Sequence, residues 1–151
     1  MNASDEAMMR EALKEAQIAL EMGELPVGCV IAKGNQILAR GHNLRETTFN
    51  PTAHAEIVAI RKAAEMLHSW RLSDCTLYVT LEPCPMCAGA ISQSRIQRLV
   101  YGAPDPNQGC AGSIYRIPED PAFSHFCRSD GGVLEADCRE ILNRFFESKR
   151  K

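Results

Sequence analysis

Two short motifs near the middle of the chain hold the residues best suited to chemistry. The run His54-Ala-Glu56 supplies an imidazole and a carboxylate, and Pro83-Cys-Pro-Met-Cys87 supplies two thiols. Imidazole nitrogen and thiolate sulfur are common zinc ligands, and three protein ligands with an open fourth position are typical of catalytic zinc. Zinc lowers the pKa of bound water from 15.7 towards about 7. The motifs therefore predict a site that activates water, with Glu56 carrying the proton.

The spacing of the second motif indicates how its thiols are prepared to bind metal. Pro85 suits the first position of a helix, which places Cys84 at the helix cap and Cys87 one turn further on. Unpaired N–H groups and the helix dipole at such an end favour the thiolate. Two thiolates, neutral His54 and one divalent zinc ion would make a formally neutral site.

The first motif constrains where its helix can begin. Residues two apart in a regular helix point to roughly opposite sides, so His54 and Glu56 could not both face one metal from a helix interior. They must lie at the first turn. Pro51 followed by Thr52, a possible N-cap, favours a helix boundary just before them.

The cysteine pair also admits simpler interpretations. It could be half of a structural zinc site completed by Cys75 or Cys110, or two buried thiols; either interpretation leaves Glu56 without a role. The remaining cysteines are expected to be buried small side chains, and the remaining histidines to be at the surface or hydrogen-bonded. These are Cys29, Cys75, Cys110, Cys127 and Cys138, and His42, His68 and His125.

Length and composition indicate one folded domain spanning residues 1–151. The hydrophobic fraction is 45% and the charged fraction 24%, which is ordinary for a globular protein. No apolar stretch approaches the roughly 20 residues of a membrane helix, and the N-terminus lacks an export signal, so a cytoplasmic protein with reduced thiols is expected. A net charge of −2 gives no global attraction to nucleic acid. Any such binding needs a local patch; the basic tail Lys149–Lys151 could contact phosphate or simply be a solvated helix end.

Hydrophobic periodicity predicts alternating helices and strands around these motifs, with parallel pairing in the middle of the chain. A long loop over 102–132, with a helical turn around Ile114–Arg116, precedes a last helix that carries Cys138, Ile141, Leu142, Phe145 and Phe146 on one face. The other expected elements are a helix capped by Ser4 and ending at Gly23, a hairpin of Val27–Ala32 with Gln36–Ala39, a helix over Ala53–Leu67, a strand over Thr76–Thr80, a helix over Pro85–Ser94 and a strand over Arg98–Tyr101.

The combination H-x-E with P-C-x-x-C is the known signature of zinc-dependent nucleobase deaminases. Longer segments, in order along nearly the whole chain, resemble the bacterial tRNA-specific adenosine deaminases, the TadA family of the cytidine deaminase-like superfamily. These segments are Glu24–Gly28, His42–Thr47, Pro51–Glu56, Thr76–Ala90, Tyr101–Pro106 and Gly109–Ser113.

The resemblance implies an α/β fold, a three-layer α/β/α sandwich around a mixed five-stranded sheet, in a homodimer with one zinc ion per subunit. It implies hydrolytic conversion of the wobble adenosine to inosine in a tRNA anticodon stem-loop, chiefly that of the arginine tRNA reading ACG. By matching position, Asn43 would hydrogen-bond the flipped adenine, Val27 and Ala55 would line the base pocket, and Asp105 would lie on the loop that holds a neighbouring nucleotide or ribose.

Two positions depart from the family pattern, and two other functions compete with it. Glu147 follows the Phe pair where relatives often have a basic residue, and Cys110 stands where small residues are common. A deaminase of free guanine or cytosine compounds would share fold and zinc site, although Asn43 and the loop Gly102–Ser113 argue against it. A catalytically silent, zinc-stabilised RNA-binding module would not need Glu56.

Overall fold

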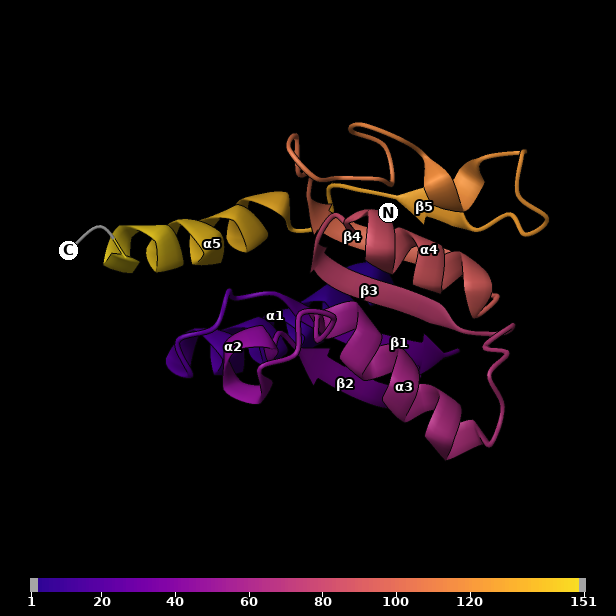
Figure 1. Ribbon diagram of the computed structural model, residues 1–151, viewed down its shortest axis with the longest axis horizontal. Helices are drawn as coiled ribbons and strands as arrows, with labels where there is room; N and C mark the ends of the chain where they lie inside the picture. The colour runs from indigo at the N-terminus through magenta and orange to yellow at the C-terminus, as the bar shows by residue number, and fades with distance from the viewer. Residues whose placement is uncertain (1–2, 150–151) are drawn as a thin grey trace.

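A five-stranded mixed sheet forms the middle layer of the protein (Figure 1). The computed structural model describes residues 3–149. The strand order is β2-β1-β3-β4-β5, in which β1 pairs antiparallel with β2 and β3, and β3, β4 and β5 run parallel. The strands are β1 Gly28–Lys33, β2 Gln36–His42, β3 Thr76–Leu81, β4 Arg98–Ala103 and β5 Arg128–Asp130. The predicted hairpin and the predicted parallel pairing of the middle strands are confirmed.

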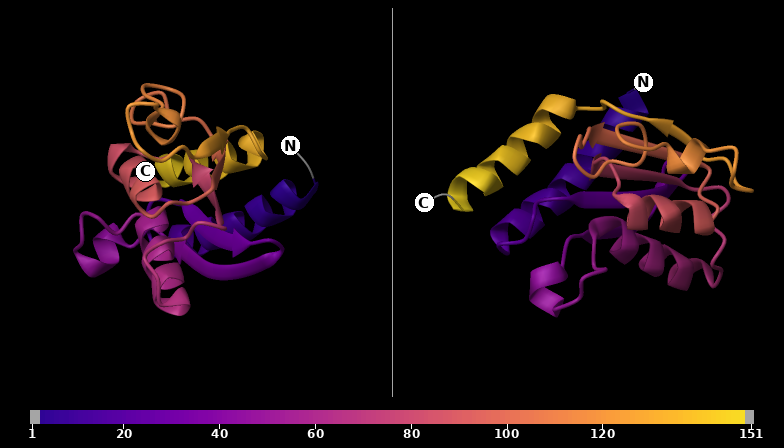
Figure 2. Two further views of the ribbon diagram at one scale, coloured as in Figure 1. Left: turned by 90° about the vertical axis from the view of Figure 1, so that its right-hand side faces the viewer. Right: turned by 45° about the horizontal axis from the view of Figure 1, so that its top comes forward.

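Helices cover both faces of this sheet (Figure 2). Alternate residues of β1 point to opposite faces: Cys29 and Ile31 pack in one apolar core, and Val30 and Ala32 in a second. The first core includes α3 (Ala55–Leu67) and α4 (Pro85–Gln93), and the second includes α1 (Ala3–Glu21) and α5 (Glu135–Lys149). Two separate cores on one sheet confirm the three-layer α/β/α sandwich.

The first helix is tied to the sheet by charge as well as by apolar packing. Asp5, in its first turn, is buried and accepts two hydrogen bonds, of 2.9 and 2.8 Å, from the guanidinium of Arg98 in β4. Arg98 also donates to Asp130 in β5. The acidic first turn was predicted, but Ser4 is not the cap, because the described helix already includes Ala3.

The second half of the chain departs most from the prediction. The loop over 102–132 contains the short strand β5, which was not predicted, and its helical turn is the 3-10 segment η1 at Ile117–Glu119 rather than at 114–116. In α5, Cys138 and Ile141 are buried, but Phe146 is 49% exposed, because the helix extends past the sheet (Figure 1). Of the basic tail, Arg150 and Lys151 lie outside the described residues.

A close contact between β2 and α3 fixes where the third helix begins. A Cβ atom at Gly41 would lie 2.6 Å from the Ala55 carbonyl oxygen and 2.8 Å from the Ala59 nitrogen, so only glycine fits there. The first turn of α3 is thereby held directly against the sheet. Since His54 and Glu56 lie at this turn, the contact also sets the position of both.

Among residues 3–149, no helix is both long enough and apolar enough to cross a lipid bilayer.

Candidate active site

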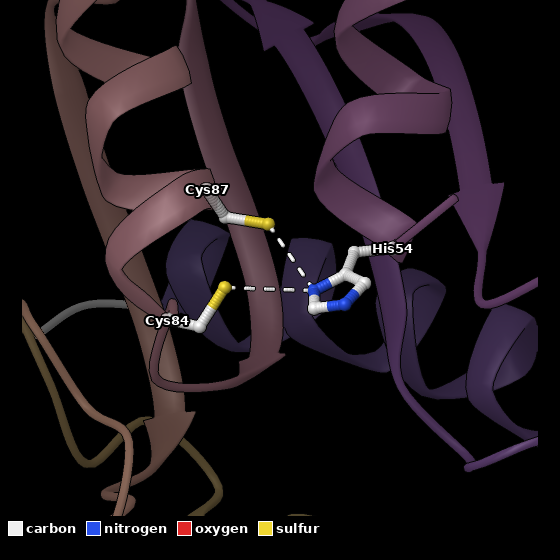
Figure 3. A group of neighbouring side chains, drawn as sticks. All are labelled: His54, Cys84 and Cys87. Atoms are coloured by element: carbon white, nitrogen blue, oxygen red, sulfur yellow. Dashed lines mark hydrogen bonds between the residues drawn. The ribbon is translucent and has the colours of Figure 1, made fainter. Parts of the chain in front are cut away.

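His54, Cys84 and Cys87 form a compact group between α3 and α4 (Figure 3). His54 Nδ1 lies 3.6 Å from Cys84 Sγ and 3.5 Å from Cys87 Sγ. Zinc bonds of about 2.0–2.1 Å to nitrogen and about 2.3 Å to sulfur, at a tetrahedral angle, place N and S about 3.6 Å apart. The three side chains are therefore already spaced as metal ligands. Neither Cys75 nor Cys110 belongs to this group.

Two helix N-termini converge on this group. Cys84 is the N-cap of α4 with Pro85 in its first turn, as predicted. His54 is the N-cap of α3, with φ −72° and ψ 156°, so its backbone is extended rather than helical. That conformation removes the geometric conflict with Glu56, which lies in the first helical turn. Thr52 is not the cap: its backbone N–H and hydroxyl donate to Asn50 Oδ1 in the preceding turn.

The ionisation of these groups follows from their contacts. Hydrogen bonds from Cys87 and His54, which outweigh burial, lower the pKa of Cys84 to about 4, so this thiol is ionised at neutral pH. The hydrogen bond to Cys84, and then burial, raise the pKa of Cys87. The pKa of His54 is also raised, chiefly by its hydrogen bond to Cys84. Cys84 is therefore the thiolate of the pair, and Cys87 is the protonated thiol.

Glu56 is a buried carboxyl group beside the candidate metal ligands. Its side chain is only 4% exposed, and desolvation raises its pKa to about 7. A carboxyl group with a pKa near the working pH can both accept and release a proton. Its environment therefore suits the proton-carrying role predicted for it.

One cavity of about 280 Å³ lies beside this group. The cavity brings together His54, Glu56 and Cys84 with all four residues expected at the substrate: Val27, Asn43, Ala55 and Asp105. It also has lining residues that sequence reasoning missed, namely Leu25, Arg45, Leu81, Glu82 and Gln108. Cys87 is fully buried behind them. The structure thus gathers the predicted residues in one place, and the role of each stays a prediction.

Asn43 and Asp105 line the cavity from two separate loops, each shaped by its own hydrogen bonds. Asn43 Oδ1 accepts the backbone N–H of Arg45 at 3.2 Å, which leaves the amide NH₂ as the group available to a bound molecule. Asp105 Oδ1 accepts the N–H groups of Asn107 and Gln108 and so closes a turn. The carboxylate that was expected to meet substrate therefore also shapes its own loop.

Two buried glutamates bind the loops around the cavity. Glu24 accepts the N–H groups of Glu46 and Thr47 in α2 (Arg45–Thr48) at 3.1 and 2.6 Å. Glu82 binds the loop that contains Asp105. Burial alone would raise both pKa values, but these hydrogen bonds lower them. Both glutamates lie in segments that resemble the family. No pattern in the neighbouring sequence predicts that their carboxylates bind backbone N–H groups far along the chain.

The other cysteines and histidines lie as predicted. Cys29, Cys75, Cys110, Cys127 and Cys138 are buried free thiols. His42 pairs with Glu15 at 2.9 Å, His125 contacts the carbonyl of Ile96 at 2.7 Å, and His68 is exposed at the end of α3.

Comparison with known proteins gives consistent results. The model of the MafB19-like deaminase family matches residues 3–150. The tRNA-specific adenosine deaminase of Bacillus subtilis is 48% identical over 147 residues, which is 97% of this chain and 91% of the relative.

Two solved structures are also similar to this chain. One, from a study of A-to-I editing by tRNA:A34 deaminases at the wobble position of transfer RNA, has a TM-score of 0.86 and 44% identity over 89% of this chain and 98% of its own. The guanine deaminase of Bacillus subtilis has a TM-score of 0.64 and 42% identity over 69% of this chain and 66% of its own. The metal-ligand group is thus set in a deaminase fold, and a relative of nearly the same extent specifies the branch: the chain belongs to the tRNA-specific adenosine deaminases.

Proposed function

We propose that this protein is a metal-dependent tRNA adenosine(34) deaminase, which converts the wobble adenosine of an anticodon to inosine. The observation that carries the proposal is the joint opening of the metal-ligand group and Glu56 on to one cavity, in a chain that belongs to this family. The reaction consumes one water molecule: a C–O bond forms at C6 of the base, the C–N bond to the amino group breaks, and ammonia leaves.

We infer that the metal is zinc, one ion per subunit, held by His54, Cys84 and Cys87. The nitrogen and sulfur donor set and the N–S separations of 3.5 and 3.6 Å support this choice. When bound, zinc acts as a Lewis acid that makes water nucleophilic at neutral pH.

Glu56 performs the proton transfers. Its carboxylate takes a proton from the attacking water, gives it to a ring nitrogen of the base and then assists the amino group to leave as ammonia. With its pKa raised to about 7 by burial, neither the charged nor the neutral form is strongly favoured at neutral pH. The buried position also keeps bulk water away from both transfers.

The remaining wall residues hold the base. Asn43 presents its NH₂ group to an acceptor on the edge of the base, and Val27 and Ala55 supply an apolar wall. Asp105 lies on the loop that would meet the adjoining ribose or nucleotide. Turning a base out of its stack costs least where it is unpaired, which suits an anticodon loop.

The test is to incubate the zinc-loaded protein with an ACG anticodon stem-loop and, separately, with free adenosine, cytidine and guanine. We expect inosine at the wobble position and no product from the free compounds. A stem-loop with guanosine at the wobble position is the matched control. Guanine turnover without stem-loop turnover would instead place the protein with the guanine deaminases, which one similar structure makes the strongest rival.

We also propose that the protein is a homodimer that works in the cytoplasm, where tRNA is found. Several large apolar side chains are exposed, among them Phe49 at 92%, together with Tyr115, Phe123 and Phe126, and a partner subunit could cover side chains of this kind. Light scattering should give about twice the chain mass of 16.7 kDa. A monomer at micromolar concentration would contradict the dimer.

A further inference from the structure

Glu82 is a buried carboxylate whose role differs from that of Glu56. It follows β3 directly, is 2% exposed, and precedes the Pro83–Cys87 motif. Among the described residues, no Lys, Arg or His lies within ion-pair distance of its carboxylate, and no polar side-chain atom of this buried group is left unsatisfied. Its charge is therefore balanced by hydrogen-bond donors.

All four hydrogen bonds that Glu82 accepts come from one loop, residues 105–113. Oε1 accepts the backbone N–H of Asp105 at 3.0 Å and the hydroxyl of Ser113. Oε2 accepts the backbone N–H groups of Ala111 and Ser113 at 3.0 and 2.9 Å. The backbone N–H of Cys110 also donates to the Pro83 carbonyl at 2.8 Å. The whole loop is thus attached to residues 82–83.

Gly109 lets this loop lie directly on the carboxylate. A Cβ atom at position 109 would overlap the Glu82 carboxyl group and the carbonyl oxygen of Asp105. Any larger residue would push the loop away from Glu82. The close fit and the four hydrogen bonds act together to fix the loop backbone.

The attachment joins two parts of the proposed active site. The loop places Asp105 and Gln108 on the cavity wall, and Glu82 stands two residues before the metal ligand Cys84. We propose that Glu82 is a positioning residue that holds the 105–113 loop as the substrate-binding wall, at a set distance from the metal centre. This inference rests on the proposed function and assigns Glu82 an indirect part in substrate binding.

Replacing Glu82 by glutamine tests the role with little change in size. On the Oε2 side an NH₂ group would face two backbone N–H donors. On the Oε1 side it would face one backbone N–H and the Ser113 hydroxyl, which can reverse and accept. The glutamine therefore places its NH₂ group on the Oε1 side. The hydrogen bond from the Asp105 N–H is then the one that is lost.

For Glu82→Gln we expect KM for the ACG stem-loop to rise about tenfold, with kcat changed less than about threefold, because binding interactions are lost and the reacting groups are not. Hydrogen exchange of amides in 104–113 should accelerate in protein with or without substrate, while α3 and α4 keep their protection. Zinc content should stay at one ion per chain. Unchanged exchange in the loop, or a fall in kcat alone, would overturn the proposal.

Two further variants separate positioning from stability. Glu119→Gln makes the same neutral replacement at a glutamate that accepts the Ser129 N–H at 3.0 Å, away from the cavity, and should leave KM unchanged. In an Asp105→Ala background, Glu82→Gln should change KM less than about twofold, because the side chain that Glu82 places is already absent. Independent, multiplying effects would overturn the proposal.

If Glu82→Gln fails to fold, Ser113→Ala removes only the hydroxyl bond, and it should raise KM two- to threefold and loosen the same loop. If the wild type does not deaminate the stem-loop, the proposed function fails. The exchange measurement still decides whether Glu82 holds the loop.

Discussion

Glu56→Gln should lower kcat/KM for the anticodon stem-loop by about 10²–10⁴-fold, the range measured for general acid–base groups. The upper end is expected because one carboxyl group performs successive transfers. Glutamine has nearly the same shape but can neither take up nor release the proton. The metal should remain bound, since Glu56 is not among the ligands.

A control on the same helix makes this result specific. Glu65 is exposed on α3, so Glu65→Gln should leave kcat/KM unchanged. Product analysis by mass spectrometry and metal analysis of all three proteins provide the measurement. Inosine formation retained in Glu56→Gln would reject the mechanism and favour the silent RNA-binding module, for which Glu56 has no function.

Cys87→Ser should remove most of the bound metal and, with it, deamination. Serine is a poor zinc ligand because it stays protonated at neutral pH. We expect kcat to fall at least about 10³-fold and Tm to fall, since metal that binds only the folded state stabilises it. Chelation of the wild-type protein should reproduce both effects, and zinc should reverse them.

Two other cysteines provide matched controls and test the structural-site alternative. Cys75→Ser and Cys110→Ala alter buried thiols that lie outside the ligand group, so the metal content should stay at one ion per chain. Their expected cost is stability alone, about 1 kcal/mol for such a change. Loss of metal in either variant would mean that a third cysteine, as the fourth ligand, closes the site and that no position is open for water.

The sequence predicted that His54, Cys84 and Cys87 come together, because ligand chemistry restricts both residue type and spacing. Pro85 also marked the start of α4, and this placed Cys84 at its cap. The start of α3 was less well defined: Thr52 looked like a cap, but its hydroxyl is engaged in a local turn with Asn50. The cap is His54, whose position depends on the contact of α3 with Gly41 in β2, and that contact is not local in sequence.

The elements that the sequence did not predict are defined by distant partners. β5 is three polar residues with no periodic pattern, and it is placed by its parallel pairing with β4 and by the Arg98–Asp130 ion pair. Glu82 could be read in the family motif, but its four donors lie 23 to 31 residues further on. Contacts of this kind emerge only when the chain is folded.

The two helix caps, His54 and Cys84, have a consequence for how this fold can be adapted. The proposed metal ligands lie at the first turns of helices packed on the sheet, whereas Asn43 and Asp105 lie on separate loops next to backbone held by Glu24 and Glu82. An engineer who seeks a different base could therefore redesign the two loops, each with its own anchoring glutamate, and leave the reaction centre untouched. Chemistry and selectivity are thus assigned to different parts of one scaffold, which meet on the Asp105 side at the residues between Glu82 and Cys84.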